Sequence, residues 1–164
     1  MSTPHRLDPD QYAGYRLYSL TICTCHRAHR FTNQLVVELV QSQILRTATK
    51  EGYEVLAYCF MPDHVHLVVA GMREEVDLRR FVSASKQASG FEYARARRSR
   101  LWQANFFDRT IRRSDDLRAI IAYMLNNPVR KGLVDDLRHY PYWGSQIYTR
   151  EQLLEFVGTA RRRP

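Results

Sequence analysis

The chain has 164 residues, which suits a single domain, and 45% of them are apolar, enough to form a buried core. No apolar run reaches the roughly 18–20 residues that span a bilayer, and residues 1–10 lack the apolar stretch of a signal peptide. Three cysteines are too few, and odd in number, for a disulfide scaffold. Composition therefore excludes a membrane-spanning or disulfide-rich secreted protein, and we expect a cytoplasmic one.

Positive charge is concentrated in one stretch of the chain. Lys and Arg number 25 against 17 Asp and Glu, a net charge of +8. Residues 79–113 hold ten of these basic residues and only two acidic ones, so this basic stretch carries the whole net charge. Six aromatic residues are interleaved with it: Phe81, Phe91, Tyr93, Trp102, Phe106 and Phe107.

Basic side chains interleaved with aromatic ones are typical of a nucleic-acid surface, which favours a nucleic-acid-binding protein. The alternative is an amphipathic helix with a solvated basic face and a buried aromatic face. Of the two, the concentration of charge favours nucleic acid.

The first half of the chain predicts a strand, a helix and a β-hairpin after a loose arm at residues 1–11. Apolar and polar residues alternate in the first strand. Thr32 or Asn33 can cap the helix, and Gly52 can end it. Met61-Pro62-Asp63 predicts the hairpin turn, because proline cannot pair in the centre of a ladder. The elements cover residues 12–25 (strand), about 33–49 (helix), 53–60 (strand) and 64–70 (strand).

The second half predicts residues 76–97 as a helix, 106–113 as a strand and 114–127 as a helix that Ser114 caps and Pro128 ends. The order β-α-β-β-α-β predicts an α+β fold of the ferredoxin-like split βαβ type. This fold is an antiparallel sheet with helices on one face, here followed by one further helix. We expect one domain over residues 12–150, whose last part packs back on it, and a basic tail over residues 151–164.

His64 and His66 stand two residues apart on a predicted strand, directly after the turn. Side chains at i and i+2 of a strand point to the same face, so the two imidazoles project side by side while Val65 faces the core. Two imidazoles in this arrangement can hold a metal ion. The alternative is a histidine pair without function.

The last predicted helix carries an apolar stripe formed by Leu117, Ile120, Ile121 and Met124. Tyr123 and Asn127 fall within about 40° of each other on the flank of that stripe, one turn apart. The Asn127 carboxamide oxygen is a hard ligand that can complete a two-histidine site for Mg²⁺ or Mn²⁺. The Tyr123 phenol is a candidate nucleophile; alternatively, it is an ordinary boundary tyrosine, one of ten in the chain.

Several segments resemble those of a known enzyme family. They read YCFMPDHVHLVV (58–69), LWQ (101–103), FFDR (106–109) with Arg112, YMLNNPVRKGLV (123–134) and YPYWGS (140–145). The first is similar to the His-hydrophobe-His (HUH) signature of single-tyrosine transposases of the insertion-sequence-200-like group. The tyrosine block, with asparagine four residues after the tyrosine and then Pro-Val, most resembles the REP-associated tyrosine transposase (RAYT) branch. The resemblance covers about residues 12–150, and Gly144, where serine is expected, is a small departure.

The resemblance implies a nucleoid-associated enzyme that cuts and rejoins single-stranded DNA near hairpins formed by palindromic repeats. Tyr123 would attack and form a 5′-phosphotyrosine, while His64, His66 and Asn127 would hold Mg²⁺ or Mn²⁺ at the scissile phosphate. Family members act as monomers or homodimers, so either state is expected. The candidate DNA-binding residues are Lys86, Arg95, Arg97, Arg98, Arg100, Trp102, Arg109, Arg112, Arg113, Arg130 and Lys131.

Two alternatives stay open. A domesticated protein could bind hairpin DNA without cutting it, although all the catalytic residues of the family are present. Cys23, Cys25, His26 and His29 could instead bind zinc, but their spacing is not a standard zinc pattern, and strand cysteines more often pack as small apolar residues. A two-histidine phosphoesterase is excluded because the chain lacks the pair of His-x-Ser/Thr motifs that this class needs.

Overall fold

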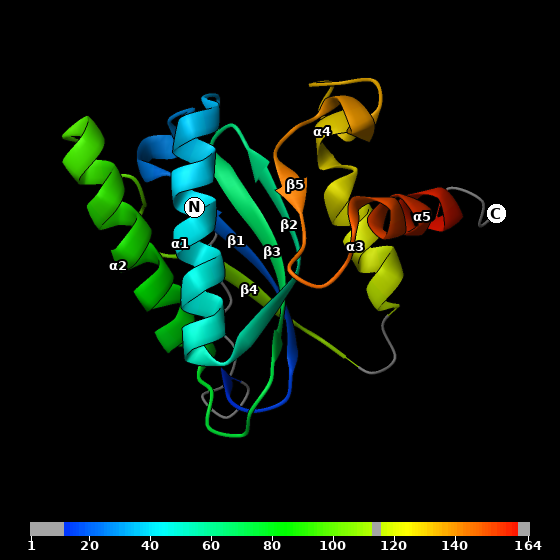
Figure 1. The fold of residues 1–164 in the computed structure, drawn as a ribbon, viewed down its shortest axis with the longest axis horizontal. Coiled ribbons are helices and arrows are strands. Elements are labelled where there is room, and N and C mark those ends of the chain that lie inside the picture. Colours follow the sequence, from blue (N-terminus) through cyan, green and yellow to red (C-terminus); the bar gives the residue numbers. More distant parts are fainter. Residues whose placement is uncertain (1–11, 113–115, 161–164) are drawn as a thin grey trace.

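The computed structural model describes residues 12–112 and 116–160. Its centre is a five-stranded antiparallel sheet in the order β4-β1-β3-β2-β5 (Figure 1). The strands are β1 (Leu17–Cys23), β2 (Tyr53–Met61), β3 (His64–Gly71), β4 (Phe107–Ile111) and β5 (Trp143–Gly144). Because β3 lies between β1 and β2, an antiparallel strand splits the β1-α1-β2 unit, which is the ferredoxin-like pattern that the order of elements predicts.

Helices cover both faces of this sheet. Helices α1 (Gln34–Glu51) and α2 (Leu78–Arg97) pack side by side on one face, and α3 (Leu117–Leu125) and α5 (Arg150–Ala160) pack on the other (Figure 1). Alternate strand residues feed two separate apolar clusters, as Val65 and Val68 of β3 do. The predicted α+β fold is confirmed, with α1 and α2 on one face; the extra helices lie opposite.

Local signals set the ends of the helices. The Asn33 side chain accepts from the N–H groups of Leu35 and Val36, and Gly52 follows α1 with a φ of 78°, a left-handed conformation that favours glycine. Asp77 caps α2 in the same way, and Asp116 caps α3 by accepting from the Ala119 N–H. Ser114, the cap predicted for α3, lies outside the described residues.

The structure differs from the prediction in three places. Strand β1 begins at Leu17, because Gly14 turns the chain before it with a φ of 80°. Helix α3 ends at Leu125, and the short helix α4 (Asn127–Arg130) follows with Pro128 in its first turn, where a missing N–H is tolerated.

The third difference is the C-terminal part, which packs back as expected but is ordered further than predicted. Strand β5 pairs with β2, and residues 150–160 form α5 against α3 rather than a plain tail. Short 3-10 turns lie at Cys25–Arg27 and Leu137–His139. In the described part of the chain, no helix is both long and apolar enough to cross a bilayer.

Candidate active site

Both histidines project from β3 onto the face of the sheet that α3 partly covers. Val65, between them, is fully buried on the opposite face, as the alternation predicts. The Nε2 atoms of His64 and His66 lie 2.9 Å apart, with the two rings at 88° to each other. Two imidazole nitrogens therefore converge on one point, as a two-histidine metal site requires.

Each histidine is held from behind by a polar partner on its other ring nitrogen. His64 Nδ1 donates to Asp63 Oδ1 at 2.6 Å, and His66 Nδ1 lies 2.9 Å from the Thr21 hydroxyl oxygen. Asp63 is also paired with Arg27, whose Nε lies 2.9 Å from Oδ2. Such partners fix the orientation of each ring and direct Nε2 towards a ligand.

The surroundings keep both imidazoles neutral. Burial, together with the nearby His64 and Arg27, lowers the pKa of His66 to about 3. Burial also lowers the pKa of His64, although the Asp63 carboxylate opposes this shift. Burial alone would raise the pKa of Asp63, but the hydrogen bond from His64 and the charge of Arg27 outweigh it and lower that pKa. Neutral imidazole is the form that binds a metal ion.

The depressed pKa of His66 predicts a stability that falls in acid. Between pH 6.5 and about 3, His66 takes up a proton in the unfolded chain but not in the folded one, so the unfolding free energy decreases as the pH falls through this range. At pH 5 the loss from this group should be about 1–2 kcal/mol relative to pH 7. Urea unfolding at the two pH values should show a smaller loss for His66→Asn than for the wild type. Equal losses would show that His66 keeps an ordinary pKa.

Tyr123 stands on α3 at the rim of the same site. It is 62% exposed, whereas its neighbours Ala122 and Met124 are buried. The Arg130 guanidinium lies over its ring, 4.0 Å from the ring centroid, and the Nη1 atom of Arg130 donates to Asn127 Oδ1 at 3.0 Å. Arg130, predicted as a DNA contact, therefore links the phenol ring to the carboxamide.

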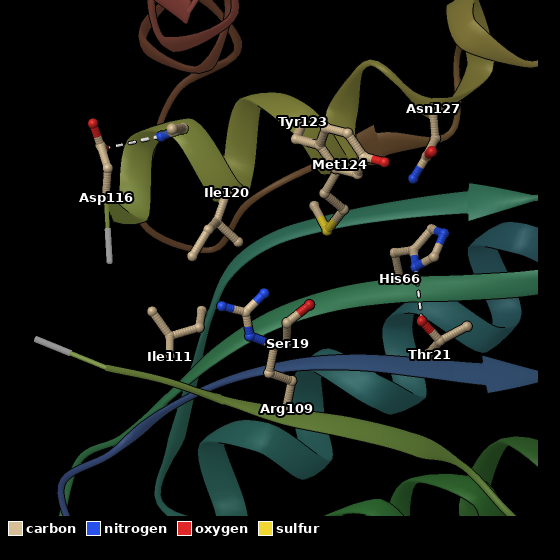
Figure 2. A pocket seen from close by; sticks show the side chains of 11 residues that line it. Ser19, Thr21, His66, Arg109, Ile111, Asp116, Ile120, Tyr123, Met124 and Asn127 are labelled. Carbon is tan, nitrogen blue, oxygen red and sulfur yellow. Dashed lines mark hydrogen bonds between the residues drawn. The ribbon is translucent and has the colours of Figure 1, made fainter. Parts of the chain in front are cut away.

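Of the predicted catalytic and metal-binding residues, His66, Tyr123 and Asn127 line a cavity of about 580 Å³ (Figure 2), whereas His64 is not among its lining residues. Thr21 and His66 lie on the sheet below it, and Tyr123 and Asn127 lie above on α3 and α4, with the Tyr123 hydroxyl pointing towards Asn127 and His66. The structure thus brings together residues that are about 60 positions apart in the chain. The remaining lining residues are Ser19, Arg109, Ile111, Asp116, Ala119, Ile120 and Met124.

The donor set of this site fits a divalent cation. Residues 12–112 and 116–160 contain no group of three or more His, Cys, Asp or Glu that could hold a metal ion, so a third protein ligand has to be of another type. The Asn127 carboxamide, which lines the cavity together with His66, is the predicted third ligand. A mixed nitrogen and oxygen set with open positions would suit a cation that also binds phosphate. The zinc alternative gains no support, because Cys23 is buried and its sulfur accepts from Arg27 Nη1 at 2.6 Å.

Exposed arginines lie at the same end of the sheet as the histidines. Arg95, Arg97, Arg98 and Arg100 are exposed at the end of α2 and in the loop after it. That loop is joined to β1, because Gln103 N donates to Cys23 O, and Cys23 lies opposite His64 in the ladder. A groove of about 680 Å³ between α2 and the loop is lined by Arg98 and Arg100, among others.

The other predicted DNA contacts are dispersed. Arg109 is exposed and lines the cavity beside His66, and Arg112 and Lys131 are exposed elsewhere. Arg113 lies outside the described residues. Whether these side chains contact DNA stays a prediction.

Two predicted DNA contacts have hydrogen-bond partners within the protein. Trp102 is 4% exposed, and its Nε1 donates to Ser89 Oγ inside the core, so the indole cannot stack on a base. Lys86 Nζ donates to the carbonyl oxygens of Gln103 and Ala104 at 2.7 and 2.6 Å and so fastens the loop. Burial of Phe81, Tyr93 and Trp102 agrees with the amphipathic alternative for these rings, whereas Phe91 and Phe107 are exposed.

The sequence does not predict Thr21, Asp63 or Arg27 as site residues. Asp63 adjoins His64, so its position was a usable signal. Thr21 reaches the site because it lies opposite His66 in the β1–β3 ladder, and this register is a property of the folded sheet.

Comparison with known proteins agrees with the motifs. A family model described as "Transposase IS200 like" matches residues 15–127. A Haemophilus influenzae protein assigned to the REP-associated tyrosine transposases is 26% identical over 137 residues, which are 77% of this chain and 77% of that protein. The REP-associated tyrosine transposase of Escherichia coli K12 is 24% identical over 106 residues, 64% of this chain and 62% of that protein.

Solved structures share the fold. A REP-associated tyrosine transposase bound to a REP hairpin has a TM-score of 0.70 and 21% identity, over 87% of this chain and 82% of that one. A Deinococcus radiodurans protein assigned as a transposase has a TM-score of 0.52 and 27% identity, over 71% of this chain and 92% of that one. Since the family model covers well over half of its residues, the protein belongs to the IS200-like transposase family, and its relatives are REP-associated tyrosine transposases.

Proposed function

We propose that the protein cuts and rejoins single-stranded DNA with Tyr123 as its nucleophile. The observation that carries this proposal is that Tyr123, His66 and Asn127 line one cavity. Tyr123 is exposed there, whereas core tyrosines such as Tyr18 and Tyr53 cannot reach a phosphate. A single chain supplies all of these groups, which favours an active site completed within one subunit.

The proposed reaction exchanges one phosphate ester for another. The phenolic oxygen of Tyr123 gives up its proton and bonds to phosphorus, while the DNA 3′ oxygen leaves and takes up a proton. The products are a 5′-phosphotyrosine and a free 3′-OH. Attack by a 3′-OH on the phosphotyrosine rejoins a strand without a nucleotide cofactor, because the link conserves the phosphodiester energy. A divalent cation held by His64, His66 and Asn127 would neutralise charge on the scissile phosphate.

Neighbouring side chains orient the two histidines, the Tyr123 ring and the Asn127 carboxamide. Asp63 and Thr21 keep the Nε2 atoms of the two histidines directed at one point. Arg130 holds the Tyr123 ring and the Asn127 carboxamide together. A carboxamide oxygen has two lone pairs, so Asn127 Oδ1 can accept from Arg130 and still offer a lone pair to a cation.

The comparison with relatives supports hairpin DNA as the substrate of this protein. They are REP-associated transposases, and the solved relative with a TM-score of 0.70 is bound to a REP hairpin. The exposed arginines after α2 supply positive charge for a phosphate backbone, and they lie at the histidine end of the sheet. One DNA molecule could therefore contact both regions.

Reversal of charge in this region should weaken DNA binding and flatten its salt dependence. In the double variant Arg97→Glu/Arg98→Glu, each lost phosphate contact should reduce the slope of log K against log salt by about 0.7 for single strands. Fluorescence anisotropy at several salt concentrations measures both quantities. Arg46→Glu, an exposed position on α1 outside the basic stretch, serves as the control. Unchanged affinity and slope in the double variant would make these arginines an ordinary solvated surface.

A covalent trapping experiment tests the proposed function. The protein is incubated with Mg²⁺ or Mn²⁺ and hairpins with single-stranded flanks, taken from palindromic repeats beside its gene. We expect an adduct that survives boiling in detergent and contains a label placed at the 3′ end of the DNA. The fragment labelled at its 5′ end should be released from the protein with a free 3′-OH. Tight hairpin binding without any adduct would instead favour a domesticated binding protein.

A further inference from the structure

An exposed aromatic ring lies on the sheet in line with the histidine pair. Phe107 of β4 is 45% exposed. It lies opposite Thr21 of β1, which in turn lies opposite His66 of β3. Residues directly opposite each other in an antiparallel ladder point to the same face, and the contact between Thr21 and His66 Nδ1 at 2.9 Å agrees with this. Phe107, Thr21 and His66 therefore form one row across the sheet.

This row is continuous with the proposed active site. Adjacent strands are about 4.8 Å apart, so the Phe107 backbone lies about 10 Å from that of His66. Arg109 and Ile111, which share the face of Phe107 by strand alternation, line the same cavity as His66 and Tyr123. The ring thus stands about two strand spacings from the imidazole that faces the scissile phosphate in the proposed function.

A single DNA strand is the occupant that this surface fits. Strand β4 belongs to the stretch that carries the whole +8 net charge of the chain, and Arg109 is exposed two residues from the ring. Unpaired bases stack on exposed aromatic rings of β-sheet faces while basic side chains follow the backbone. A paired base in a duplex has no free face to offer.

We propose that Phe107 is a stacking platform for an unpaired base next to the cleaved phosphate. This inference rests on the proposed function, because it needs single-stranded DNA to lie across His66. Stacking accepts every base, so Phe107 would align the strand without selecting its sequence.

Binding to DNA with and without bases tests this proposal. The probes are a fluorescein-labelled dT20 and a 20-mer of the same backbone with abasic residues throughout, measured by anisotropy in EDTA so that no strand is cut. The wild type should bind dT20 more tightly than the abasic strand. Phe107→Leu should narrow this difference by about tenfold, the size of one lost stacking contact, and Phe107→Trp should restore it. Tyr15→Leu, which removes an exposed ring before the start of β1, should leave it unchanged.

The outcomes separate this proposal from the proposed function. An equal loss of affinity for both strands in Phe107→Leu, or an unchanged difference between them, would overturn the stacking role. A wild type that binds both strands equally would overturn it as well. The covalent adduct on hairpin DNA is scored separately, so normal adduct formation alongside either result would leave Tyr123 chemistry intact and remove only the platform.

Discussion

Tyr123→Phe should abolish both DNA cleavage and the covalent adduct, with a rate loss of more than about 1,000-fold, while hairpin binding stays normal. The substitution removes only the phenolic oxygen, which is the attacking atom in the proposed function. The ring stays under Arg130, and Tyr123 is 62% exposed, so the unfolding free energy should change by less than about 0.5 kcal/mol. Cleavage of labelled hairpin DNA, followed on denaturing gels, measures the effect.

Two further variants control this result. Tyr15→Phe makes the same chemical change at an exposed tyrosine before the start of β1 and should cut DNA normally. Asn127→Ala should slow the reaction without moving the attachment point, because Asn127 is proposed as a ligand. An adduct that persists in Tyr123→Phe would mean that another tyrosine attacks and that the cavity is not the active site.

His64→Ala and His66→Ala should each reduce cleavage by more than about 100-fold and leave hairpin binding within a few-fold. Each change removes one of two nitrogens that lie 2.9 Å apart, whereas DNA binding is spread over many phosphate contacts. Binding of Mn²⁺, measured from the loss of the free-ion signal in electron paramagnetic resonance, should weaken in parallel. Retained hairpin binding beside weakened Mn²⁺ binding separates loss of the cation from general damage to the fold, which would reduce both.

Two further variants serve as controls for His64→Ala and His66→Ala. His139 is an exposed histidine that is hydrogen-bonded to Asp135, so His139→Ala is a matched control and should alter neither cleavage nor Mn²⁺ binding. Asp63→Asn should have an intermediate effect, about 10–100-fold on Mn²⁺ affinity, because it keeps both imidazoles and weakens the hydrogen bond to His64 together with the ion pair to Arg27. Cleavage at the wild-type rate in His64→Ala or in His66→Ala would contradict the assignment of these two histidines.

Local patterns predicted the elements that bury a continuous face. The alternation in β3 and the residues Asn33 and Gly52 at the ends of α1 are each local signals, read from a few consecutive residues. The structure has this strand and these helix ends where the sequence predicts them. Strand β5 carries no such signal, because its two residues are defined only by pairing with β2. The same pairing accounts for Gly144, since a Cβ there would lie 2.6 Å from the Tyr58 hydroxyl.

The candidate site was predictable as two halves but not as a whole. His64 and His66 are linked by strand period, and Tyr123 and Asn127 by about one helical turn, so each pair follows from spacing alone. That His66, Tyr123 and Asn127 line one cavity depends on how α3 packs over the sheet, which no local spacing encodes. For the same reason, composition could not show that Trp102 points inward while Phe107 points outward.

Peptide mapping of the trapped adduct tests the central claim most directly. The wild-type adduct, formed on hairpin DNA with Mg²⁺, is digested with a nuclease and then with trypsin, which cuts after Arg118 and Arg130. The resulting peptide, residues 119–130, contains Tyr123 as its one tyrosine. We predict that mass spectrometry finds this peptide carrying a nucleotide through its 5′ phosphate at Tyr123. A nucleotide on any other peptide, or linked through a 3′ phosphate, would contradict the proposed mechanism.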